Sequence, residues 1–264
     1  MDVTAVSRDV HGNISRAIWM LSQAEIRYVE ATNWTNDVHI CSISDNQLRE
    51  LKHMLDDREI RVSMIETTLD GPDSIKRWAR ELDLASALET KHVRVTPFKK
   101  EACSYDEVVR TLQQAAEEAK RRGLIVTIEN GCPSRHASSP EEIKALMKDV
   151  AVDNFHLCWD PCAHARFHGP DQESMEAARK VALDFADYIH VTDMVVEPDE
   201  KYVCPGCGIM GYEKIFQDLI GAGYSGFYAL KPGCGKGDTR TLKQSSVALR
   251  QMLRKARRVA APMG

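Results

Sequence analysis

The sequence predicts one closed (β/α)8 barrel that spans residues 1–264. Short runs of β-branched and apolar residues alternate with amphipathic helical patterns along the whole chain, and such alternation is typical of a parallel sheet covered by helices. About eight strand–helix units follow one another without a linker or a change of composition, which matches an eight-stranded barrel. Neither a G-x-G-x-x-G phrase nor a Walker loop is present, so an open nucleotide-binding sheet is not favoured.

The predicted strands are short and rich in valine, isoleucine and aromatic residues. They cover residues 3–6, 26–32, 61–68, 92–97, 124–130, 154–161, 187–193 and 226–231. The first predicted helix carries Ile14, Ala17, Ile18 and Leu21 on one apolar face. The later helices cover residues 44–55, 74–88, 104–123, 139–150, 173–186, 211–223 and 239–258.

Helix starts are marked by capping residues. Ser44 and Gln47 have the spacing of a capping box, and the helix that begins near residue 104 repeats this spacing with Ser and Glu. Ser139 is a predicted N-cap that is followed by Pro140 at the first helical position. These signals support the helical reading of the polar-rich segments.

The bulk composition is that of an ordinary soluble protein. The net charge is −4, which does not suggest binding to nucleic acid or to an acidic membrane. The one strongly basic run, residues 250–258, suits the C-terminal end of a helix. No apolar run approaches the roughly 20 residues that a membrane span needs, and the first residues do not resemble a secretory signal.

Eight cysteines without a secretory signal favour free thiols in a reducing compartment, so we expect a cytoplasmic protein. Cys204 and Cys207 form a C-x-x-C pair. Together with Cys132, Cys162 or Cys234 this pair could form a thiolate metal site, although free loop thiols or a redox-labile pair are the simpler interpretation.

Chemistry in such a barrel is expected at the carboxyl ends of the strands. Polar residues at these ends are Glu30, Glu66, Arg94, Glu129, Asn130, Asp160, His164, His190, Asp193 and Lys231. Glu129, Asp160 and His190 lie on three consecutive strands, and two carboxylates with one imidazole suit Mn²⁺, Mg²⁺, Co²⁺ or Zn²⁺. The alternative is that each residue caps a helix or pairs with a base.

Four phrases resemble, in order, those of the sugar phosphate isomerase/epimerase superfamily, the xylose isomerase-like barrels. They are IVTIENG (125–131), FHLCWDP (155–161), YIHVTDM (188–194) and GYSGFYALK (223–231). The resemblance covers most of the chain and implies a TIM barrel in which Glu129, Asp160 and His190 bind a divalent metal. It also places His164 near a histidine of the sixth loop, one position later than the common spacing.

The chain departs from this family at Lys231, which stands where the family has a fourth ligand, a Glu. The resemblance implies that epimerases use both metal-bound glutamates as bases on opposite faces of an enediolate, so one base is missing here. Three arrangements remain open. The metal stays on three ligands with Lys231 as acid, base or oxyanion-binding group; the ammonium replaces the metal and pairs with Glu129 and Asp160; or Lys231 forms a Schiff base with a carbonyl substrate.

We therefore expect an isomerase or epimerase that acts on a sugar or sugar-like carbonyl or polyol, with a divalent metal and Glu129 as the base. A metal-free lyase or dehydratase, or a non-catalytic barrel with Lys231 paired to the carboxylates, is the alternative. The residues expected to bind substrate are His164, Arg94, Glu30 and Asp193. The expected partner is a small molecule rather than nucleic acid or a membrane. An endonuclease of the superfamily is disfavoured by the pI near 6.2, and a homo-oligomer is expected only by analogy.

Overall fold

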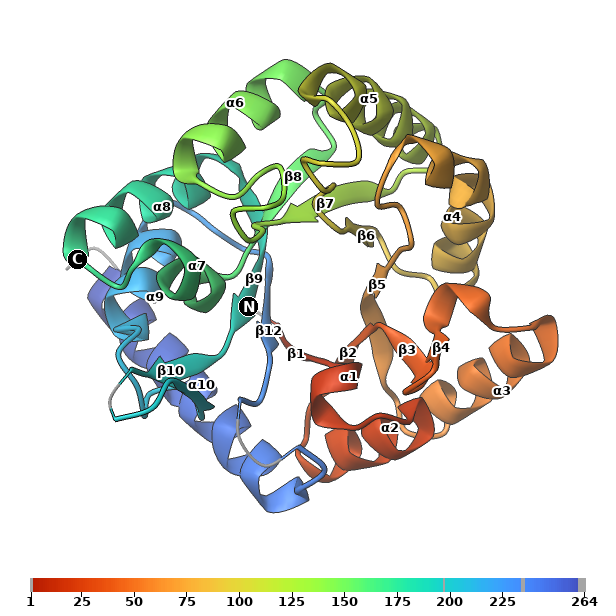
Figure 1. Ribbon diagram of the computed structural model, residues 1–264. Helices are drawn as coiled ribbons and strands as arrows, with labels where there is room; N and C mark the ends of the chain where they lie inside the picture. The colour runs from red at the N-terminus through yellow and green to blue at the C-terminus, as the bar shows by residue number, and fades with distance from the viewer. Residues whose placement is uncertain (1, 197, 234–235, 261–264) are drawn as a thin grey trace.

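The computed structural model describes residues 2–196, 198–233 and 236–260. Its eight parallel strands close into a barrel in the order β1-β12-β9-β8-β7-β6-β5-β2, with helices around the outside (Figure 1). These strands are β1 Val3–Val6, β2 Tyr28–Ala31, β5 Arg61–Glu66, β6 His92–Val95, β7 Ile125–Glu129, β8 Phe155–Trp159, β9 Ala186–Val191 and β12 Phe227–Leu230. The predicted (β/α)8 barrel is therefore confirmed.

The outer ring follows the predicted helical patterns. Its helices are α2 Ile14–Gln23, α3 Asp45–Asp56, α4 Trp78–Ala87, α5 Tyr105–Arg121, α6 Pro140–Val150, α8 Gln172–Phe185, α9 Tyr212–Gly221 and α10 Thr239–Ala260. The capping box at Ser44 forms, since the Ser44 backbone N–H donates to Gln47 Oε1 at 2.8 Å. The one shortened helix is α4, because residues 72–77 form a 3₁₀ segment, η2 Pro72–Arg77, before the α-helix begins.

The elements that the sequence did not predict are all short and follow the strands. They are the one-turn helix α1 Ser7–Val10, the hairpin of β3 Asn33–Thr35 and β4 Val38–His39, the 3₁₀ turn η1 Ile40–Ser42, the helix α7 Pro161–His168, and the hairpin of β10 Asp193–Val195 and β11 Lys201–Val203. A segment this short has too few residues to show a helical or strand period. These insertions surround one end of the barrel, where the polar strand ends lie.

Two apolar clusters fill the barrel, and a polar layer lies between its strands. The larger cluster joins the strands to the helices and includes Trp159, which points outward as the alternation along its strand predicts. The small inner cluster includes Met64 and Tyr188. Next to it, Ser63 hydrogen-bonds both the Thr4 hydroxyl at 2.8 Å and the Tyr188 hydroxyl at 2.9 Å. These three buried hydroxyl groups are thus paired with one another, as burial favours.

Within the described residues, no helix is long and apolar enough to cross a membrane.

The left-handed backbone conformation at the end of α6 can be tested by substitution of Ala151. It has φ 49° and ψ 37°, a left-handed conformation that costs a residue with a Cβ atom about 1 kcal/mol. Ala151→Gly should therefore raise the free energy of unfolding by about 0.5–1 kcal/mol in urea denaturation. The matched change Ala145→Gly, on the exposed face of the same helix, should lower it by about 1 kcal/mol. A loss of stability from both changes would contradict the left-handed assignment.

Candidate functional site

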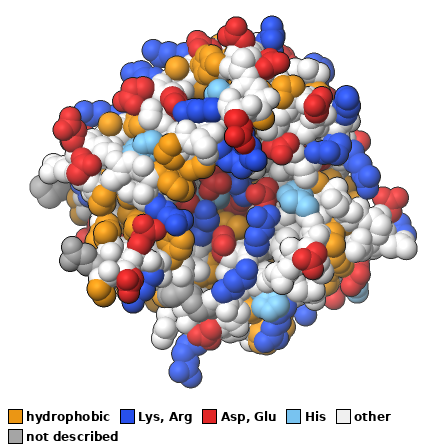
Figure 2. All heavy atoms as spheres, viewed as in Figure 1, with side chains coloured by type: hydrophobic (Ala, Val, Ile, Leu, Met, Phe, Trp, Pro, Cys, Tyr) orange, Lys and Arg blue, Asp and Glu red, His pale blue; other side chains and the backbone are white. Residues whose placement is uncertain are grey.

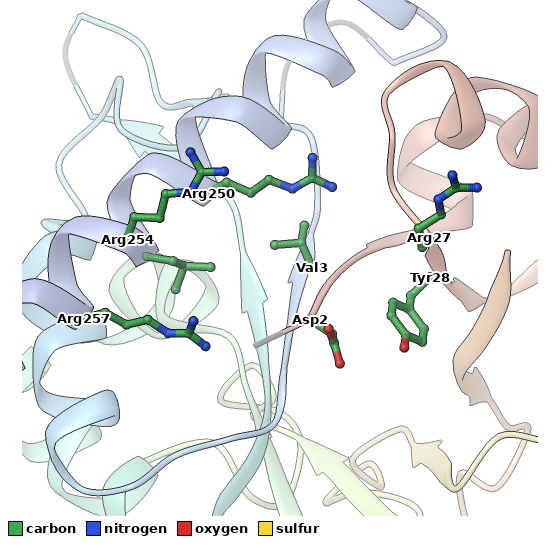
Figure 3. A pocket seen from close by; sticks show the side chains of 8 residues that line it. Asp2, Val3, Arg27, Tyr28, Arg250, Arg254 and Arg257 are labelled. Carbon is green, nitrogen blue, oxygen red and sulfur yellow. The ribbon is translucent and has the colours of Figure 1, made fainter. Parts of the chain in front are cut away.

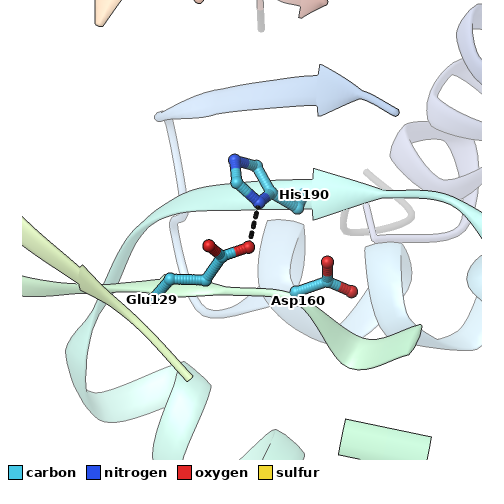
Figure 4. Close-up of side chains that lie close together, drawn as sticks. All are labelled: Glu129, Asp160 and His190. Atoms are coloured by element: carbon cyan, nitrogen blue, oxygen red, sulfur yellow. Dashed lines mark hydrogen bonds and ion pairs between the residues drawn. The ribbon is translucent and has the colours of Figure 1, made fainter. Parts of the chain in front are cut away.

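The carboxyl ends of three neighbouring strands bring Glu129, Asp160 and His190 together (Figure 4). Glu129 is the last residue of β7, Asp160 directly follows β8, and His190 is next to last in β9. One potential ligand atom from each residue lies within 4.8 Å of the other two. The structure thus brings together the three residues that the sequence singled out as metal ligands.

Lys231 directly follows β12 and reaches the same group. Its Nζ donates to Asp160 Oδ2 at 2.9 Å and to Glu129 Oε1 at 3.3 Å. Burial alone would lower the pKa of Lys231, but the carboxylates of Asp160 and Glu129 raise it well above its ordinary value. Lys231 is therefore an ammonium group that lies beside two of the three potential ligands.

His190 lies between two carboxylates. Its Nδ1 is 2.7 Å from Glu129 Oε1 and its Nε2 is 2.9 Å from Glu30 Oε2, and the imidazole is fully buried. Burial would lower the pKa of His190, but its acidic neighbours, Glu30 and Glu129 among them, raise it well above its ordinary value. Both ring nitrogens therefore donate, and the ring is held as an imidazolium.

Arg94, from β6, joins three carboxylates on the other side of the group. Its Nε donates to Glu30 Oε1 at 2.9 Å and its Nη1 donates to Glu129 Oε2 at 2.6 Å. Its Nη2 lies 3.2 Å from Glu66 Oε1. Although burial raises the pKa of Glu66, Arg94 and neighbouring basic groups lower it to about 2. The planar guanidinium fixes the relative positions of these carboxylates, as its fork geometry allows.

The charges at the centre of the site balance without any further ion. Glu30, Glu66, Glu129 and Asp160 supply four negative charges. Four positive charges balance them, those of Arg8, Arg94, His190 and Lys231. Burial would raise the pKa of Glu129, but Lys231, Arg94 and His190 together hold it well below its ordinary value. Glu129 is thus a carboxylate that three cations contact.

The donor atoms are of the right kind for a divalent metal, because two carboxylates and an imidazole suit Mn²⁺, Mg²⁺, Co²⁺ or Zn²⁺. Glu129, Asp160 and His190 are the residues that would hold it. The ammonium of Lys231 is the departure from a four-ligand site, since it contacts two of these ligands and would repel the metal. The triad fits a metal only when Lys231 turns away from Glu129 and Asp160 and when His190 loses the proton that its Nδ1 donates to Glu129.

A cavity of about 580 Å³ opens above this group. Acidic and basic side chains gather in a hollow at the centre of the molecular face in Figure 2. The side chains that line the cavity include Asp9, Glu129, Asp160, Arg135, Phe167, Tyr202, Lys231 and Lys236. Glu129 and Lys231 are thus accessible to a small molecule.

Two residues that we expected to bind substrate, Glu30 and Arg94, do not line this cavity. Glu30 is 0 % exposed and Arg94 is 5 % exposed. Their side chains support Glu129 and His190 from within the barrel. Their contact with substrate stays a prediction, and the structure places both side chains below the cavity, because sequence position marks the strand end but not the depth of the side chain.

His164 also lies away from the cavity. Its Nε2 is within hydrogen-bond distance of the Ser174 hydroxyl at 3.0 Å, and its ring stacks on His168 with centroids 5.0 Å apart. Burial, helped by the charge of His168, lowers the pKa of His164 to about 4. The helix α7 thus turns His164 toward α8, and its contact with substrate stays a prediction.

Asp193 accepts hydrogen bonds from the loop that follows β11, and its expected contact with substrate stays a prediction. Its carboxylate accepts backbone N–H groups from Gly206 and Gly208 through Oδ2, and from Met194 and Met210 through Oδ1. Four backbone donors occupy both oxygens, so Asp193 fixes the loop that follows β11. This loop was not a predicted element, and without it Asp193 looked like a free carboxylate at a strand end.

The sequence analysis missed three residues of the cavity wall. Asp9 lies in α1, directly after β1, and burial raises its pKa although Lys231 opposes this effect. Phe167 and Tyr202 come from α7 and β11. An acidic residue three positions after the first predicted strand was the only signal in the sequence for Asp9.

The cysteines do not form a metal site within the described part of the chain. Glu129, Asp160 and His190 are the one group of potential ligands found there. Cys207 is a free, exposed thiol, so no disulfide joins Cys204 to Cys207. Cys132 and Cys162 are also free, and Cys234 lies outside the described residues.

Comparison with solved structures shows the same fold at low sequence identity. A xylose isomerase-like TIM barrel protein from Mycobacterium smegmatis in complex with magnesium has a TM-score of 0.79 and 15% identity, over 97% of each chain. A D-tagatose 3-epimerase-like protein has a TM-score of 0.78 and 17% identity, over 99% of this chain and 100% of that one. The probable 3-DHS dehydratase AsbF from Bacillus anthracis has a TM-score of 0.72 and 14% identity, over 95% and 99%.

No curated protein sequence matches the chain. A family model, however, matches residues 20–255, which is most of the barrel, and it describes the xylose isomerase-like TIM barrel. The sequence match and the closed barrel agree. The chain therefore belongs to the xylose isomerase-like TIM barrel family.

Proposed function

We propose that this barrel is an isomerase of small polyhydroxylated carbonyl compounds, which moves a proton between the two carbons of an enediol. One observation carries the proposal. The Glu129 carboxylate and the Lys231 ammonium, 3.3 Å apart, both border a cavity large enough for a sugar-sized molecule. A base and a positively charged group in contact at a cavity floor suit abstraction of a proton next to a carbonyl.

Glu129 is the base in this proposal. Its Oε2 is held by Arg94 at 2.6 Å, while its Oε1 accepts from His190 at 2.7 Å and has a longer contact with Lys231 at 3.3 Å. A substrate that enters the cavity competes with Lys231 for Oε1, because this contact is the longest of those that Glu129 makes. Glu129 then takes the proton from the carbon that bears the hydroxyl and returns it to the former carbonyl carbon. The hydroxyl proton passes to the former carbonyl oxygen, so a single carboxylate is sufficient for the transfer between the carbons.

Lys231 supplies positive charge at the oxygen where negative charge develops. Its shorter bond to Asp160 at 2.9 Å anchors the ammonium while the contact to Glu129 is exchanged for substrate. When Lys231 turns away from Asp160 as well, a divalent cation held by Glu129, Asp160 and His190 would supply the positive charge at the substrate carbonyl in its place and acidify the neighbouring C–H bond. Arg135 and Lys236, on the cavity wall, favour a substrate that carries an anionic group.

The lost carboxylate at position 231 favours this reaction over epimerisation by two opposed bases. Epimerisation of that kind needs a second base on the far face of the substrate, and an ammonium is unable to accept a proton. The second candidate is β-elimination of water, in which Glu129 removes the proton and Lys231 donates one to the departing hydroxyl. The ion pair of these two residues favours it, and one solved structure of the same fold is described as a probable dehydratase.

Glu129→Gln tests the base. Polyhydroxylated aldehydes and ketones, with and without phosphate or carboxylate groups, are incubated with the protein in D₂O and followed by NMR. The wild type should exchange the proton next to the carbonyl, and the variant should lose about 10²–10⁴-fold of this rate because no carboxylate remains to accept the proton.

The matched control is Glu101→Gln, a glutamate that is highly exposed and should leave the rate unchanged. Isomerised product supports the proposal, and a dehydrated product replaces it with the elimination. No exchange with any compound, by a folded wild-type protein, would make the chain a non-catalytic barrel.

Lys231→Glu tests the role of the lysine toward metal. The variant restores a fourth oxygen ligand and removes the ammonium, so it should bind Mn²⁺ at least about tenfold more tightly than the wild type in calorimetric titration. Lys231→Gln removes the charge without adding a carboxylate and should fall between the two. Equal Mn²⁺ affinity in all three proteins would show that Lys231 does not compete with the metal.

A further inference from the structure

A second cavity, of about 450 Å³, lies at the opposite end of the barrel (Figure 3). It is bordered by the beginnings of β1 and β2, whereas the Glu129 group lies at the carboxyl ends of the strands. Arg250, Arg254 and Arg257 of α10 line one side, and Arg27 lines the other. None of these residues takes part in the proposed reaction.

The three arginines of α10 face the cavity because of their spacing. Positions 250, 254 and 257 are separated by four and three residues, so they share one face of a helix. Leu253 lies between them and is buried. The basic run that the sequence places at a helix end is therefore not evenly solvated, since part of it is directed into one concave surface.

Interaction with the helix dipole explains the position of only some of these four arginines. The helix dipole favours a cation in the last turn of α10, which contains Arg257 and Arg258. Arg250 lies more than two turns before the end of that helix at Ala260, and Arg27 belongs to another segment. A further reason is needed for four guanidinium groups around one cavity.

Partners of the basic residues point to an external anion. Lys243 and Lys255 on the same helix are paired with Glu25 and Glu213, at 3.5 Å and 2.7 Å. In contrast, Arg254 and Arg257 have no hydrogen bond or ion pair with any residue that the structure describes. Among the residues that the structure describes, Lys243 and Lys255 thus have carboxylate partners, and Arg254 and Arg257 have none.

The other two arginines, Arg250 and Arg27, can also interact with an anion in the cavity. Arg250 Nη2 donates to the backbone oxygen of Glu25 at 2.6 Å, which orients the guanidinium without neutralising it. Arg27 donates to the backbone oxygen of Arg58 at 3.3 Å, and its ion pair is with Glu59 at 3.1 Å. Both side chains of this pair are mostly exposed, so its energy is small. Asp2 is the single acidic residue that lines the cavity, so the excess is about three positive charges.

We propose that this cavity binds a small organic anion that bears at least two phosphate groups, such as a nucleoside diphosphate. Arginine recognises phosphate through paired N–H donors, and three arginines on one face match a chain of phosphates. Tyr28, Val3 and Leu253 add apolar surface for the organic part of the ligand. The volume lies within the range of small-molecule sites.

Calorimetric titration of the full chain with ADP and with inorganic pyrophosphate, at about 0.15 M salt, tests the proposal. ADP should bind with a single site. The double variant R254Q/R257Q should lose about tenfold or more in affinity, because two charge-assisted contacts are removed. R258Q, which removes an arginine from the same last turn without touching the cavity, should bind as the wild type does.

The pyrophosphate arm separates the two parts of the ligand. Tighter binding of ADP than of pyrophosphate would support contact between the organic part of the ligand and the apolar residues Tyr28, Val3 and Leu253. Equal binding of the two ligands would show that the site recognises only the phosphate groups. Unchanged ADP affinity in R254Q/R257Q, with its folding verified by circular dichroism, would overturn the proposal, as would no binding by the wild type. Tighter binding of a short single-stranded oligonucleotide than of ADP would also overturn it in favour of nucleic acid.

The two sites are independently testable. E129Q, which alters the other end of the barrel, should leave ADP affinity unchanged. If E129Q loses the proton exchange and keeps ADP binding, both proposals stand. If the wild type shows no proton exchange and still binds ADP through Arg254 and Arg257, only the isomerase proposal fails.

Discussion

At the carboxyl ends of the barrel strands, the structure depends on one constraint. The charges that are buried there must be paired with one another. An isolated buried ion is strongly unfavourable, and a pair is tolerated only when its geometry and hydrogen bonds are satisfied. Here Lys231, Asp160, Glu129, His190, Glu30 and Arg94 form one continuous chain of contacts. Removal of any member takes a contact away from at least one buried neighbour, so these side chains also hold the strand ends in place.

This constraint explains how the ammonium of Lys231 is accommodated at the cavity floor. Four acids and four bases balance there, and Lys231 places its positive charge between Asp160 and Glu129. Solved structures at 14–17% identity share the fold, whereas the electrostatics of the site follow from the residues of this chain alone.

Much of the barrel could be predicted from sequence, because its regular elements are long enough to show their periods and their caps. The convergence of Glu129, Asp160 and His190 follows from the same reasoning, since neighbouring parallel strands end at one edge. The loops could not be predicted in this way. α7 turns His164 toward α8 and the hairpin of β10 and β11 encloses Asp193, so two polar residues near strand ends serve the framework. The burial of Glu30 and Arg94 could not be predicted for another reason, since sequence position does not give the depth of an inward-facing side chain.

The anchoring of the loop by Asp193 has a consequence for how the cavity accepts its ligand. Tyr202, on the cavity wall, pairs with Met194 in the hairpin, and the next residues are held by the Asp193 carboxylate. A Cβ atom at Gly208 would lie only 2.3 Å from Asp193 Oδ1, so this turn tolerates no larger residue without moving the carboxylate. Because the wall is ordered before a ligand arrives, little conformational entropy is lost on binding. Selectivity can then change through the side chain at position 202 while the loop backbone stays the same.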